Sequence, residues 1–395
     1  MTERLYYRNA ALLEFEAEIV EQGPHGDKFY TVLNRSAFYP TSGGQLFDTG
    51  FLNDIEVTEV LETEDGAVRH ITAQPVGEVG DKVTGRVDKA RRQRNRQIHT
   101  AQHILSQAFV RLYGLDSVSV HLGEEYANIE LNTSGLTSEQ LREAENLANE
   151  IIRDNLSVEV IFADEDLLKH LPLRKIPERT GTLRIIKIDD FDCSACGGTH
   201  CHFTAEVGCI KIIGYEKVRG RSQVKFLSGN LAFEDYRSRF EISDILSREL
   251  TCHFTDLPDK INKLTAGHKD AGREIARLQK ELLPIQAEKL AVNKKTVGKL
   301  TLCDSIISDL DQSLVGQLAT MTADKIEGAA LLLAGDRLYL AVSERTGLKA
   351  GEIIKELAAQ TDLRGGGGPK LAQVGGVKTE NFDKYREVIL KIADA

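Results

Sequence analysis

The chain has 395 residues and a formal net charge of −10 at pH 7. Hydrophobic residues make up 41% and charged residues 28% of the sequence, which is typical of a soluble globular protein. No apolar run approaches the roughly 18 residues that a membrane-spanning helix needs, and the N-terminus lacks the apolar core of a signal peptide. We therefore expect a cytoplasmic protein of two or three domains without a membrane partner.

Residues 1–88 alternate short apolar stretches with turn signals such as Gly43-Gly44. Short, evenly spaced strands of this kind predict a small β-barrel. The pattern becomes helical from Asp88 to Tyr113, and helices then mix with strands up to residue 237. We predict an α+β protein, with the barrel over 1–88 and an α+β layer over 89–237.

The segment 238–296 has a different periodicity. Its apolar positions follow one another at alternating spacings of four and three, which predicts a coiled coil or a helical hairpin. Pro284 is expected to stop or kink this helix. Residues 297–395 alternate helix and strand and predict an α/β domain with a Gly-rich run. The a and d positions of the helical seam are Leu257, Ile261, Leu264, His268, Ala271, Ile275, Leu278 and Leu282.

Histidine and cysteine residues cluster in two motifs. His99 and His103 lie in HTAQH on the predicted helix, where a spacing of four places both imidazoles on one face. The pair lacks the Glu of a HExxH peptidase. Further along, CSACGGTH contains Cys196 and His200. Thiolate and imidazole ligands together select zinc, so we predict one zinc ion per chain. An alternative, a CxxC zinc knuckle of Cys193 and Cys196, stays open.

Six basic residues and one acid, Asp88, lie between Arg86 and Arg96. An isolated run of this kind usually forms a solvated helix face. Because this run leads directly into the His pair, we favour contacts with nucleic-acid phosphates. The same role is expected for Arg364 and Lys370, which flank four glycines whose amides could hold a phosphate or form a flexible turn. Within the run, the expected contact residues are Arg91, Arg92, Arg94 and Arg96.

The sequence FYPTSGGQ (residues 38–45) and then DTG (residues 48–50) precede HTAQH and CSACGGTH. Together these motifs resemble the editing domain of alanyl-tRNA synthetase and its free-standing relatives, the alanyl-tRNA editing proteins. The match runs in order over residues 12–235. The C-terminal segment, with GGGGPKLAQVGG, resembles the synthetase's C-terminal domain, which also occurs in phosphoesterases of the DHH type.

The resemblance implies a zinc-dependent hydrolase that removes serine, with glycine as a further candidate, from mischarged alanine tRNA. No aminoacylation activity is expected, because the chain begins at the editing domain. The family's C-terminal domain binds the tRNA elbow and can dimerise, so a homodimer through that domain or the coiled segment is expected. Thr41 stands where many relatives carry Glu. Carried over from the family, the zinc ligands fall on His99, His103, Cys196 and His200, and the loop facing the aminoacyl end on Ser42, Gly43, Gly44 and Gln45.

Hydrolysis of an aminoacyl ester needs a positioned water and donors for the developing oxyanion. Zinc can lower the pKa of bound water to about 7 or polarise the carbonyl, whereas four protein ligands are typical of a closed, structural site. Both roles stay open. As candidate catalytic residues we take Gln45 and the Gly43 and Gly44 amides, with Thr199 behind the ligands. Gln45 is also our first choice for the serine hydroxyl.

Parts of the sequence are compatible with two other functions. One is a non-catalytic tRNA-binding or dimerisation protein in which zinc only stabilises the fold. An assay for the release of serine from Ser-tRNA(Ala) would distinguish it from a hydrolase. A phosphoesterase is suggested by the C-terminal domain. It is disfavoured, because the sequence has no DHH triplet and no aspartate cluster for a two-metal site.

Overall fold

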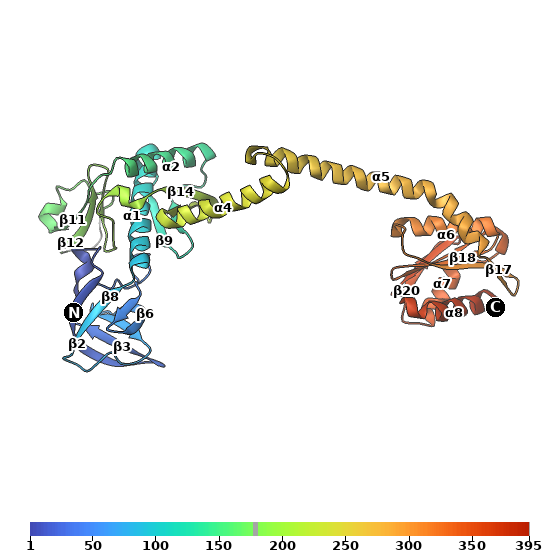
Figure 1. Cartoon of the computed structure of the whole chain (residues 1–395), viewed down its shortest axis with the longest axis horizontal. Helices are drawn as coiled ribbons and strands as arrows, with labels where there is room; N and C mark the ends of the chain where they lie inside the picture. Colours follow the sequence, from blue (N-terminus) through green and yellow to red (C-terminus); the bar gives the residue numbers. More distant parts are fainter. Residues whose placement is uncertain (177–180, 395) are drawn as a thin grey trace. The chain divides into compact units, whose positions relative to one another are not determined.

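The computed structural model describes residues 1–176 and 181–394. They form a mixed α+β fold that divides into two compact units, Met1–Ile245 and Leu246–Ala395 (Figure 1). The finer division at residues 88, 237 and 296 stays a prediction. Among the described residues, no helix is both long and apolar enough to cross a bilayer.

A closed six-stranded barrel forms the start of the first unit, as the strand pattern predicts. Side chains of one strand alternate between the core and solvent: Phe15, Ala17 and Ile19 are buried, and the glutamates between them are exposed. A strand with one buried face requires this alternation. In order around the barrel, the strands are β2 (Glu14–His25), β3 (Lys28–Leu33), β7 (Val68–Thr72), β6 (Ile55–Glu62), β5 (Gly50–Leu52) and β8 (Lys82–Val87). A short parallel pair, β1 (Glu3–Arg4) and β4 (Arg35–Ser36), and the 3-10 turn η1 (Leu5–Tyr7) complete this region.

Helix α1 (Lys89–Tyr113) follows the barrel and runs through the core of the first unit (Figure 1). Asp88 caps its start by accepting a hydrogen bond from the Arg91 amide. Gly114 ends it with a left-handed φ of 65°, which glycine adopts without steric cost. The predicted helical stretch from Asp88 to Tyr113 therefore corresponds to one continuous, buried helix.

Two antiparallel sheets surround α1. The first has the strand order β14 (Ile210–Val218), β15 (Arg221–Ser228), β10 (Ala127–Leu131) and β9 (Ser117–Leu122). The second has the order β11 (Val158–Ala163), β12 (Leu183–Ile188) and β13 (Asp192–Ala195). A capping box of Thr137 and Gln140 starts α2. The remaining elements are α2 (Ser138–Arg153), α3 (Glu165–Leu168), η2 (Thr204–Val207) and α4 (Gly229–Glu249).

The second unit is a six-stranded sheet between helices. Among its described residues, β17 and β18 pair in parallel and the other neighbouring strands are antiparallel. Helix α6 and the end of α5 pack on one face, and α7 and α8 pack on the other. The strands, in sheet order, are β16 (Lys295–Val297), β17 (Leu300–Ile307), β18 (Ala329–Ala334), β19 (Arg337–Val342), β21 (Leu371–Gly375) and β20 (Arg364–Gly367). The helices are α5 (Leu257–Val292), α6 (Gln312–Ile326), α7 (Ala350–Ala359) and α8 (Phe382–Asp394), with the 3-10 turns η3 (Phe254–Asp256), η4 (Glu344–Thr346) and η5 (Thr379–Asn381).

Pro284 lies inside α5 and does not stop the helix. Of the two effects expected from the sequence, the stop is therefore wrong, and the kink stays a prediction. A proline inside a helix removes one backbone hydrogen bond and costs about 3 kcal/mol. Leu283 and Ala287, on either side of it in sequence, are fully buried against α6. Burial of those side chains offsets the cost, because a buried leucine alone stabilises by about 2 kcal/mol.

Candidate metal centre

Four potential ligand atoms converge in the first unit. The side chains of His99, His103, Cys196 and His200 place one ligand atom each within 4.8 Å of all the others. The sulfur of Cys196 lies 3.3 Å from Nε2 of His99 and 3.3 Å from Nε2 of His200. In a tetrahedral zinc site, sulfur and nitrogen ligands are separated by about 3.6 Å. Both the donor types and their spacing therefore fit zinc.

Each histidine of the cluster is oriented through its other ring nitrogen. Nδ1 of His99 lies 2.7 Å from the Gln45 carbonyl oxygen, and Nδ1 of His103 lies 3.0 Å from a carboxylate oxygen of Asp192. The Thr100 hydroxyl lies 3.3 Å from Nδ1 of His200. When Nδ1 of a histidine is held in this way, Nε2 is left for the ion and the ring cannot rotate freely.

Charge in the cluster favours a thiolate. Burial raises the pKa of Cys196, but His99 and His200 act against it and bring the pKa well below 9.0. Burial lowers the pKa of His200 well below 6.5. For His103 burial also acts to lower the pKa, yet hydrogen bonds to Asp192 and Cys196 raise it to about 8. The Cys196 thiolate is in the donor state that zinc requires. His103, with a pKa of about 8, would release its proton when the metal binds.

The loop between Cys196 and His200 is held from behind by two buried arginines. Arg184 donates to the carbonyls of Cys196 (2.7 Å) and Gly198 (2.9 Å), and Arg96 donates to the carbonyl of His200 (2.9 Å). A Cβ atom at Gly198 would lie 2.1 Å from Cε1 of His99. Only glycine therefore lets this loop approach the helix that carries the histidines.

The loop that ends at Asp48 runs along α1. The Arg91 guanidinium donates to the carbonyl of Phe47 at 2.7 Å, and the Asn95 amide donates to that of Leu46 at 3.3 Å. One helical turn further on, His99 meets Gln45. Three successive turns of α1 thus fix the loop against the helix.

Gln45 and Thr199 lie behind His99 rather than in an open pocket. Both residues are fully buried. The Gln45 amide nitrogen donates to the Thr199 hydroxyl at 2.9 Å, and its oxygen accepts from the Thr199 backbone amide at 3.0 Å as well as facing His99. Its hydrogen-bonding atoms are already engaged, so the expectation that Gln45 meets the serine hydroxyl does not agree with this geometry.

Gly43 and Gly44, by contrast, lie at the surface next to the cluster. Both have a positive φ (56° and 83°) in a turn closed by paired hydrogen bonds between Ser42 and Gln45. The Gly44 carbonyl accepts from Leu122, which docks the turn on β9. The amides of Gly43 and Gly44 donate to no acceptor within residues 1–176 and 181–394. They are available to a ligand.

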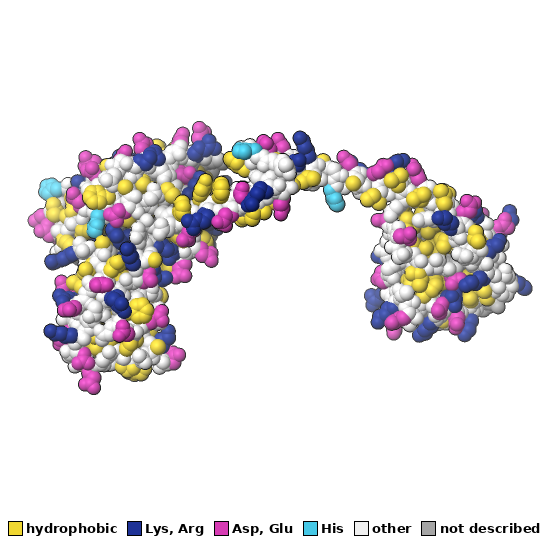
Figure 2. Space-filling model, in the orientation of Figure 1, with side chains coloured by type: hydrophobic (Ala, Val, Ile, Leu, Met, Phe, Trp, Pro, Cys, Tyr) yellow, Lys and Arg dark blue, Asp and Glu magenta, His cyan; other side chains and the backbone are white. Residues whose placement is uncertain are grey.

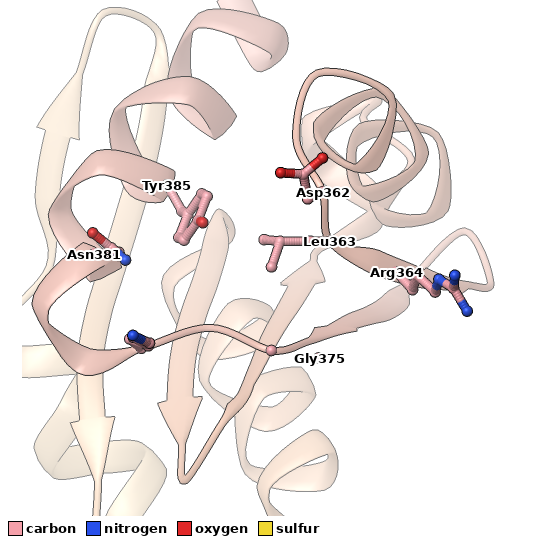
Figure 3. Close-up of a pocket in the computed structure, with 8 residues that line it drawn as sticks. Asp362, Leu363, Arg364, Gly375, Asn381 and Tyr385 are labelled. Atoms are coloured by element: carbon pink, nitrogen blue, oxygen red, sulfur yellow. The ribbon is translucent and has the colours of Figure 1, made fainter.

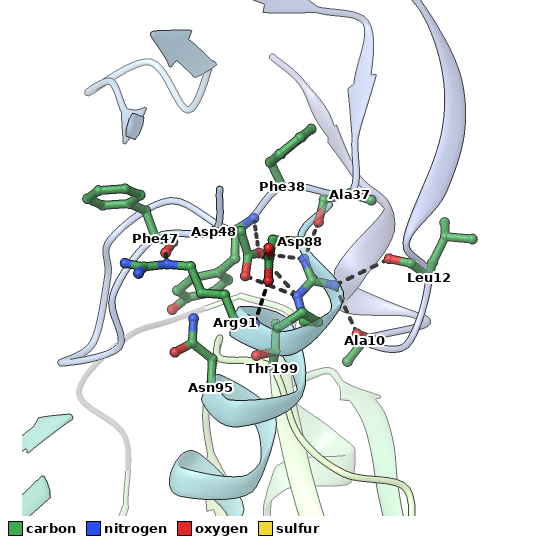
Figure 4. Close-up of polar contacts among 12 residues, drawn as sticks. Ala10, Leu12, Ala37, Phe38, Phe47, Asp48, Asp88, Arg91, Asn95 and Thr199 are labelled. Carbon is green, nitrogen blue, oxygen red and sulfur yellow. Dashed lines mark hydrogen bonds and ion pairs between the residues drawn. The ribbon is translucent and has the colours of Figure 1, made fainter. Parts of the chain in front are cut away.

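Two members of the expected phosphate-binding run are buried instead. Arg92 is 1% exposed and forms an ion pair with buried Asp48, and it also donates to the carbonyls of Ala10, Leu12 and Ala37 (Figure 4). Arg96 pairs with Glu206 in addition to its bond with His200. A charged side chain that is shielded from water is stable only when an opposite charge or hydrogen-bond acceptors pair with it. Arg92 and Arg96 therefore hold different segments of the folded chain together. The prediction that they contact phosphates is wrong.

Arg91 and Arg94 keep part of their surface. Arg91 pairs with Glu124 at 3.0 Å, and Arg94 donates to the Gly123 carbonyl at 2.7 Å. Both contacts involve the turn after β9, next to the Ser42–Gln45 turn. These two arginines stay candidates for phosphate contacts.

A pocket of about 550 Å³ opens in the second unit (Figure 3). Arg364 and Lys378 belong to its lining, with Asn381 and Tyr385 on the opposite side from Asp362 and Leu363. Lys370 is not part of this lining and pairs with Glu344 at 2.6 Å. Arg364 and Lys370 are thus not brought together around one cavity. Lys378 was not predicted from the sequence, because a single lysine near a glycine pair is common.

Cys193 does not join the ligand cluster. It packs with Ala163 and Ile185 in a separate small core, and burial raises the pKa of its thiol. Along β13, side chains alternate between faces, so Asp192 and Ser194 share a face and Cys193 points away from it. This placement does not favour the CxxC knuckle.

Asp192, Thr100, Arg184 and the structural role of Arg96 were not predicted from the sequence. Asp192 alone had a detectable signal, since it is a carboxylate four residues before Cys196 in a buried strand. In the sequence, the other three look like ordinary core or helix residues, and only the folded structure shows that they contact the ligand residues.

Comparisons with known proteins find similarity to alanine–tRNA ligases and to an alanyl-tRNA editing protein. Residues 2–91 match the family described as tRNA synthetases class II (A), residues 183–223 the threonyl and alanyl tRNA synthetase second additional domain, and residues 300–394 the DHHA1 domain. The alanine–tRNA ligase of Archaeoglobus fulgidus is 30% identical over 94% of this chain, but only 42% of the ligase is covered. The chain therefore spans less than half the length of that ligase.

A solved structure, the C-Ala domain of Aquifex aeolicus alanyl-tRNA synthetase, aligns with 26% of this chain and 98% of its own at 23% identity. Its TM-score of 0.24 is too low to support an argument. The alanyl-tRNA editing protein AlaX-L of Pyrococcus horikoshii is 31% identical, and the alignment covers 94% of both chains. With that identity over nearly its whole length, the chain belongs to the family of long-form alanyl-tRNA editing proteins.

Proposed function

We propose that this chain is a hydrolase that edits in trans and removes serine, with glycine as a second candidate, from mischarged alanine tRNA. In this reaction the oxygen of water bonds to the ester carbonyl carbon, the bond to the ribose oxygen breaks, and the ribose oxygen takes up a proton. The observation that carries the proposal is the convergence of three imidazoles and a thiol beside an exposed Gly-rich turn. The named activity of the Pyrococcus relative supports it.

The four ligands would hold one zinc ion, through Nε2 of His99, Nε2 of His200, a ring nitrogen of His103 and the sulfur of Cys196. When bound, zinc supplies either polarisation of the ester carbonyl or a bound water with a pKa of about 7. Gln45, Thr100 and Asp192 hold the rings in place for it.

Exposed groups of the Gly-rich turn would contact the ester. The Gly43 and Gly44 amides, which have no acceptor among the described residues, can donate to the oxyanion that develops on the carbonyl oxygen. The cluster reaches the surface beside this turn, because Cys196 is half-buried and Gly197 is exposed. The terminal ribose of the tRNA therefore has an approach from this side.

Recognition of the serine hydroxyl falls to Thr41 and Ser42 in this proposal, in place of Gln45. Both side chains are exposed at the turn. A site that hydrogen-bonds the serine hydroxyl gives serine a contact that alanine lacks, and the discrimination is large where the bound tRNA excludes water from these two side chains. Alanine would bind poorly for that reason.

The tRNA body would be held through cations outside the cluster. Arg91 and Arg94 flank the turn in the first unit, and Arg364 and Lys378 flank the pocket in the second. Phosphate contacts of this type position the RNA and carry little sequence information. Double replacement of Arg364 and Lys378 by alanine should weaken tRNA binding and flatten its salt dependence, while Lys370→Ala, a matched control engaged with Glu344, should change binding little.

The central experiment is deacylation of Ser-tRNA(Ala). Cys196→Ala should lose both the bound zinc and the activity, because a thiolate ligand is removed. Cys193→Ala is the matched control, since it removes a thiol three residues away that points into a separate core. Metal analysis should give one zinc per chain in the wild-type protein and the control.

Equal activity of the two variants, at matched circular dichroism, would contradict the proposal. A wild-type protein that binds tRNA and zinc but releases no serine would favour the alternative of a non-catalytic tRNA-binding protein.

A further inference from the structure

A half-buried tyrosine, Tyr7 at the end of η1, lies beside the loop that carries two of the candidate metal ligands. A Cβ atom at Gly197 would lie 3.6 Å from the Tyr7 hydroxyl oxygen. Gly197 is exposed and directly follows the ligand Cys196 in the chain. The Tyr7 hydroxyl therefore lies on the side from which the terminal ribose of the tRNA has its approach.

The ring of Tyr7 is held by the same arginine that holds the ligand loop. The Tyr7 carbonyl accepts from Nε of Arg184 at 3.1 Å, and the Arg184 guanidinium lies 5.4 Å from the centre of the Tyr7 ring. This guanidinium also donates to the carbonyls of Cys196 and Gly198. One buried side chain thus fixes the tyrosine relative to the metal ligands.

The Tyr7 hydroxyl accepts a hydrogen bond from Arg4. A guanidinium nitrogen of Arg4 lies 2.9 Å from the hydroxyl oxygen, and Arg4 also forms an ion pair with Glu62 of β6. Because a guanidinium can only donate, the hydroxyl proton must point elsewhere. In the part of the chain that the structure describes, no acceptor takes this proton. A hydrogen bond received from a cation polarises the O–H group, so the proton is a strengthened donor for a ligand.

A row of three tyrosines connects this hydroxyl to the Gly-rich turn. The Tyr6 ring is edge-on to both neighbours, with its centre 5.0 Å from that of Tyr7 and 5.2 Å from that of Tyr39. The Tyr39 hydroxyl donates to the carbonyl of Ser42 at 2.9 Å. One edge of the site therefore runs from the turn to Tyr7.

Surface charge does little to single out the aminoacylated end of a tRNA. Figure 2 shows lysine and arginine side chains mixed with acidic ones on the visible face of the first unit. Phosphate contacts position an RNA but do not distinguish its terminal nucleotide from the others. Recognition of the terminal nucleotide therefore needs hydrogen bonds at the site itself.

We propose that Tyr7 donates its hydroxyl proton to the free hydroxyl adjacent to the ester on the terminal ribose of the tRNA. The substrate class in this inference rests on the proposed function. With the ester carbonyl at the amides of the Gly-rich turn, the ribose lies further along the same edge of the site, where Tyr7 is. A ribose hydroxyl can accept this proton, and it distinguishes RNA from DNA. Tyr7 thereby positions the ester beside the ligand cluster and takes no part in the proton transfers.

Binding of a hydrolysis-resistant substrate tests this contact without the reaction. The probes are two alanine tRNAs that carry serine through an amide at the 3′ position of the terminal ribose, one with the 2′-hydroxyl and one without it. For the wild-type protein, loss of the 2′-hydroxyl should raise the Kd about fivefold, as expected for one hydrogen bond. Tyr7→Phe should raise the Kd of the first probe by the same factor and should bind both probes equally.

Tyr30→Phe is the matched control, because it removes a tyrosine hydroxyl that is bonded to Glu21 at 2.6 Å in the barrel. This variant should discriminate between the probes as the wild-type protein does, and all three proteins should keep the same zinc content.

Equal binding of both probes by the wild-type protein, or full discrimination by Tyr7→Phe, overturns the proposal. Loss of zinc from Tyr7→Phe also overturns it, because the hydroxyl would then support the ligand loop instead of the ribose. A wild-type protein that discriminates between the probes through Tyr7 but releases no serine from Ser-tRNA(Ala) contradicts the proposed function and supports the Tyr7 contact.

Discussion

Asp192→Asn isolates the role of the carboxylate behind His103. Asp192 is buried, accepts from Nδ1 of His103 at 3.0 Å and from the Ser194 hydroxyl at 3.1 Å, and lies 3.4 Å from the Arg174 guanidinium. Asparagine keeps the shape and one acceptor oxygen but loses the charge. Loss of such a partner typically weakens metal binding 10- to 100-fold. Because one acceptor remains, we expect the lower end, about tenfold or ~1.4 kcal/mol.

Competition against a chromophoric zinc chelator measures this affinity directly. Asp190→Asn is the matched control, since Asp190 is exposed and lies two residues away on the same chain segment. At saturating zinc the Asp192→Asn protein should recover most of its deacylation rate, because the ligands themselves are intact. An unchanged zinc affinity, or a loss of the same size in Asp190→Asn, would show that Asp192 does not position the ligand.

Three further outcomes are expected. Gly198→Ala should abolish zinc binding, because its Cβ would lie 2.1 Å from a ring atom of His99, while Gly197→Ala, with its nearest contact at 3.6 Å, should bind zinc normally in the same chelator assay. Gln45→Ala should reduce single-turnover deacylation of Ser-tRNA(Ala) and Ala-tRNA(Ala) equally, since Gln45 orients His99. A loss of activity on the serine substrate alone would indicate instead that Gln45 contacts the serine hydroxyl. Burial lowers the pKa of His70 from 6.5 to about 4. The folded state therefore requires the neutral ring of His70. The free energy of unfolding in urea should be at its full value above pH 6.5 and lower by about 2 kcal/mol at about pH 5. The His70→Gln protein should not show this decrease.

Local patterns were sufficient for the elements of this protein. Alternation in residues such as Phe15, Ala17 and Ile19 predicted the barrel strands, because a strand presents every second side chain to one face. The i, i+4 spacing of His99 and His103 predicted two ligands on one helix face for the same kind of reason. The Gly-Gly spacer before His200 predicted a tight turn, and Gly198 indeed lies where no side chain fits.

Contacts between residues that are distant in the sequence could be identified only from the tertiary structure. Gln45 is polar and sits in a Gly-rich motif, which from sequence favours a substrate contact. The fold instead sets it against His99, 54 positions away, and buries it. Arg92 belongs to a basic run that from sequence favours phosphate, yet Asp48 and three carbonyls surround it in the core. A residue's type limits what it can bind, whereas only packing decides whether solvent or protein reaches it.

The helical segment shows the same division within one element. The heptad spacing of its apolar residues can be seen in the sequence, and it predicts one apolar stripe along α5. The sequence does not show which apolar stripe of α5 packs against its own domain, because Leu283, Ala287 and Leu290 form a second stripe with helical spacing. The tertiary structure assigned that second stripe to α6 and left Ile261, Leu264 and their neighbours in solvent, and it carried the helix past Pro284, since burial against a neighbouring helix outweighs one missing backbone hydrogen bond.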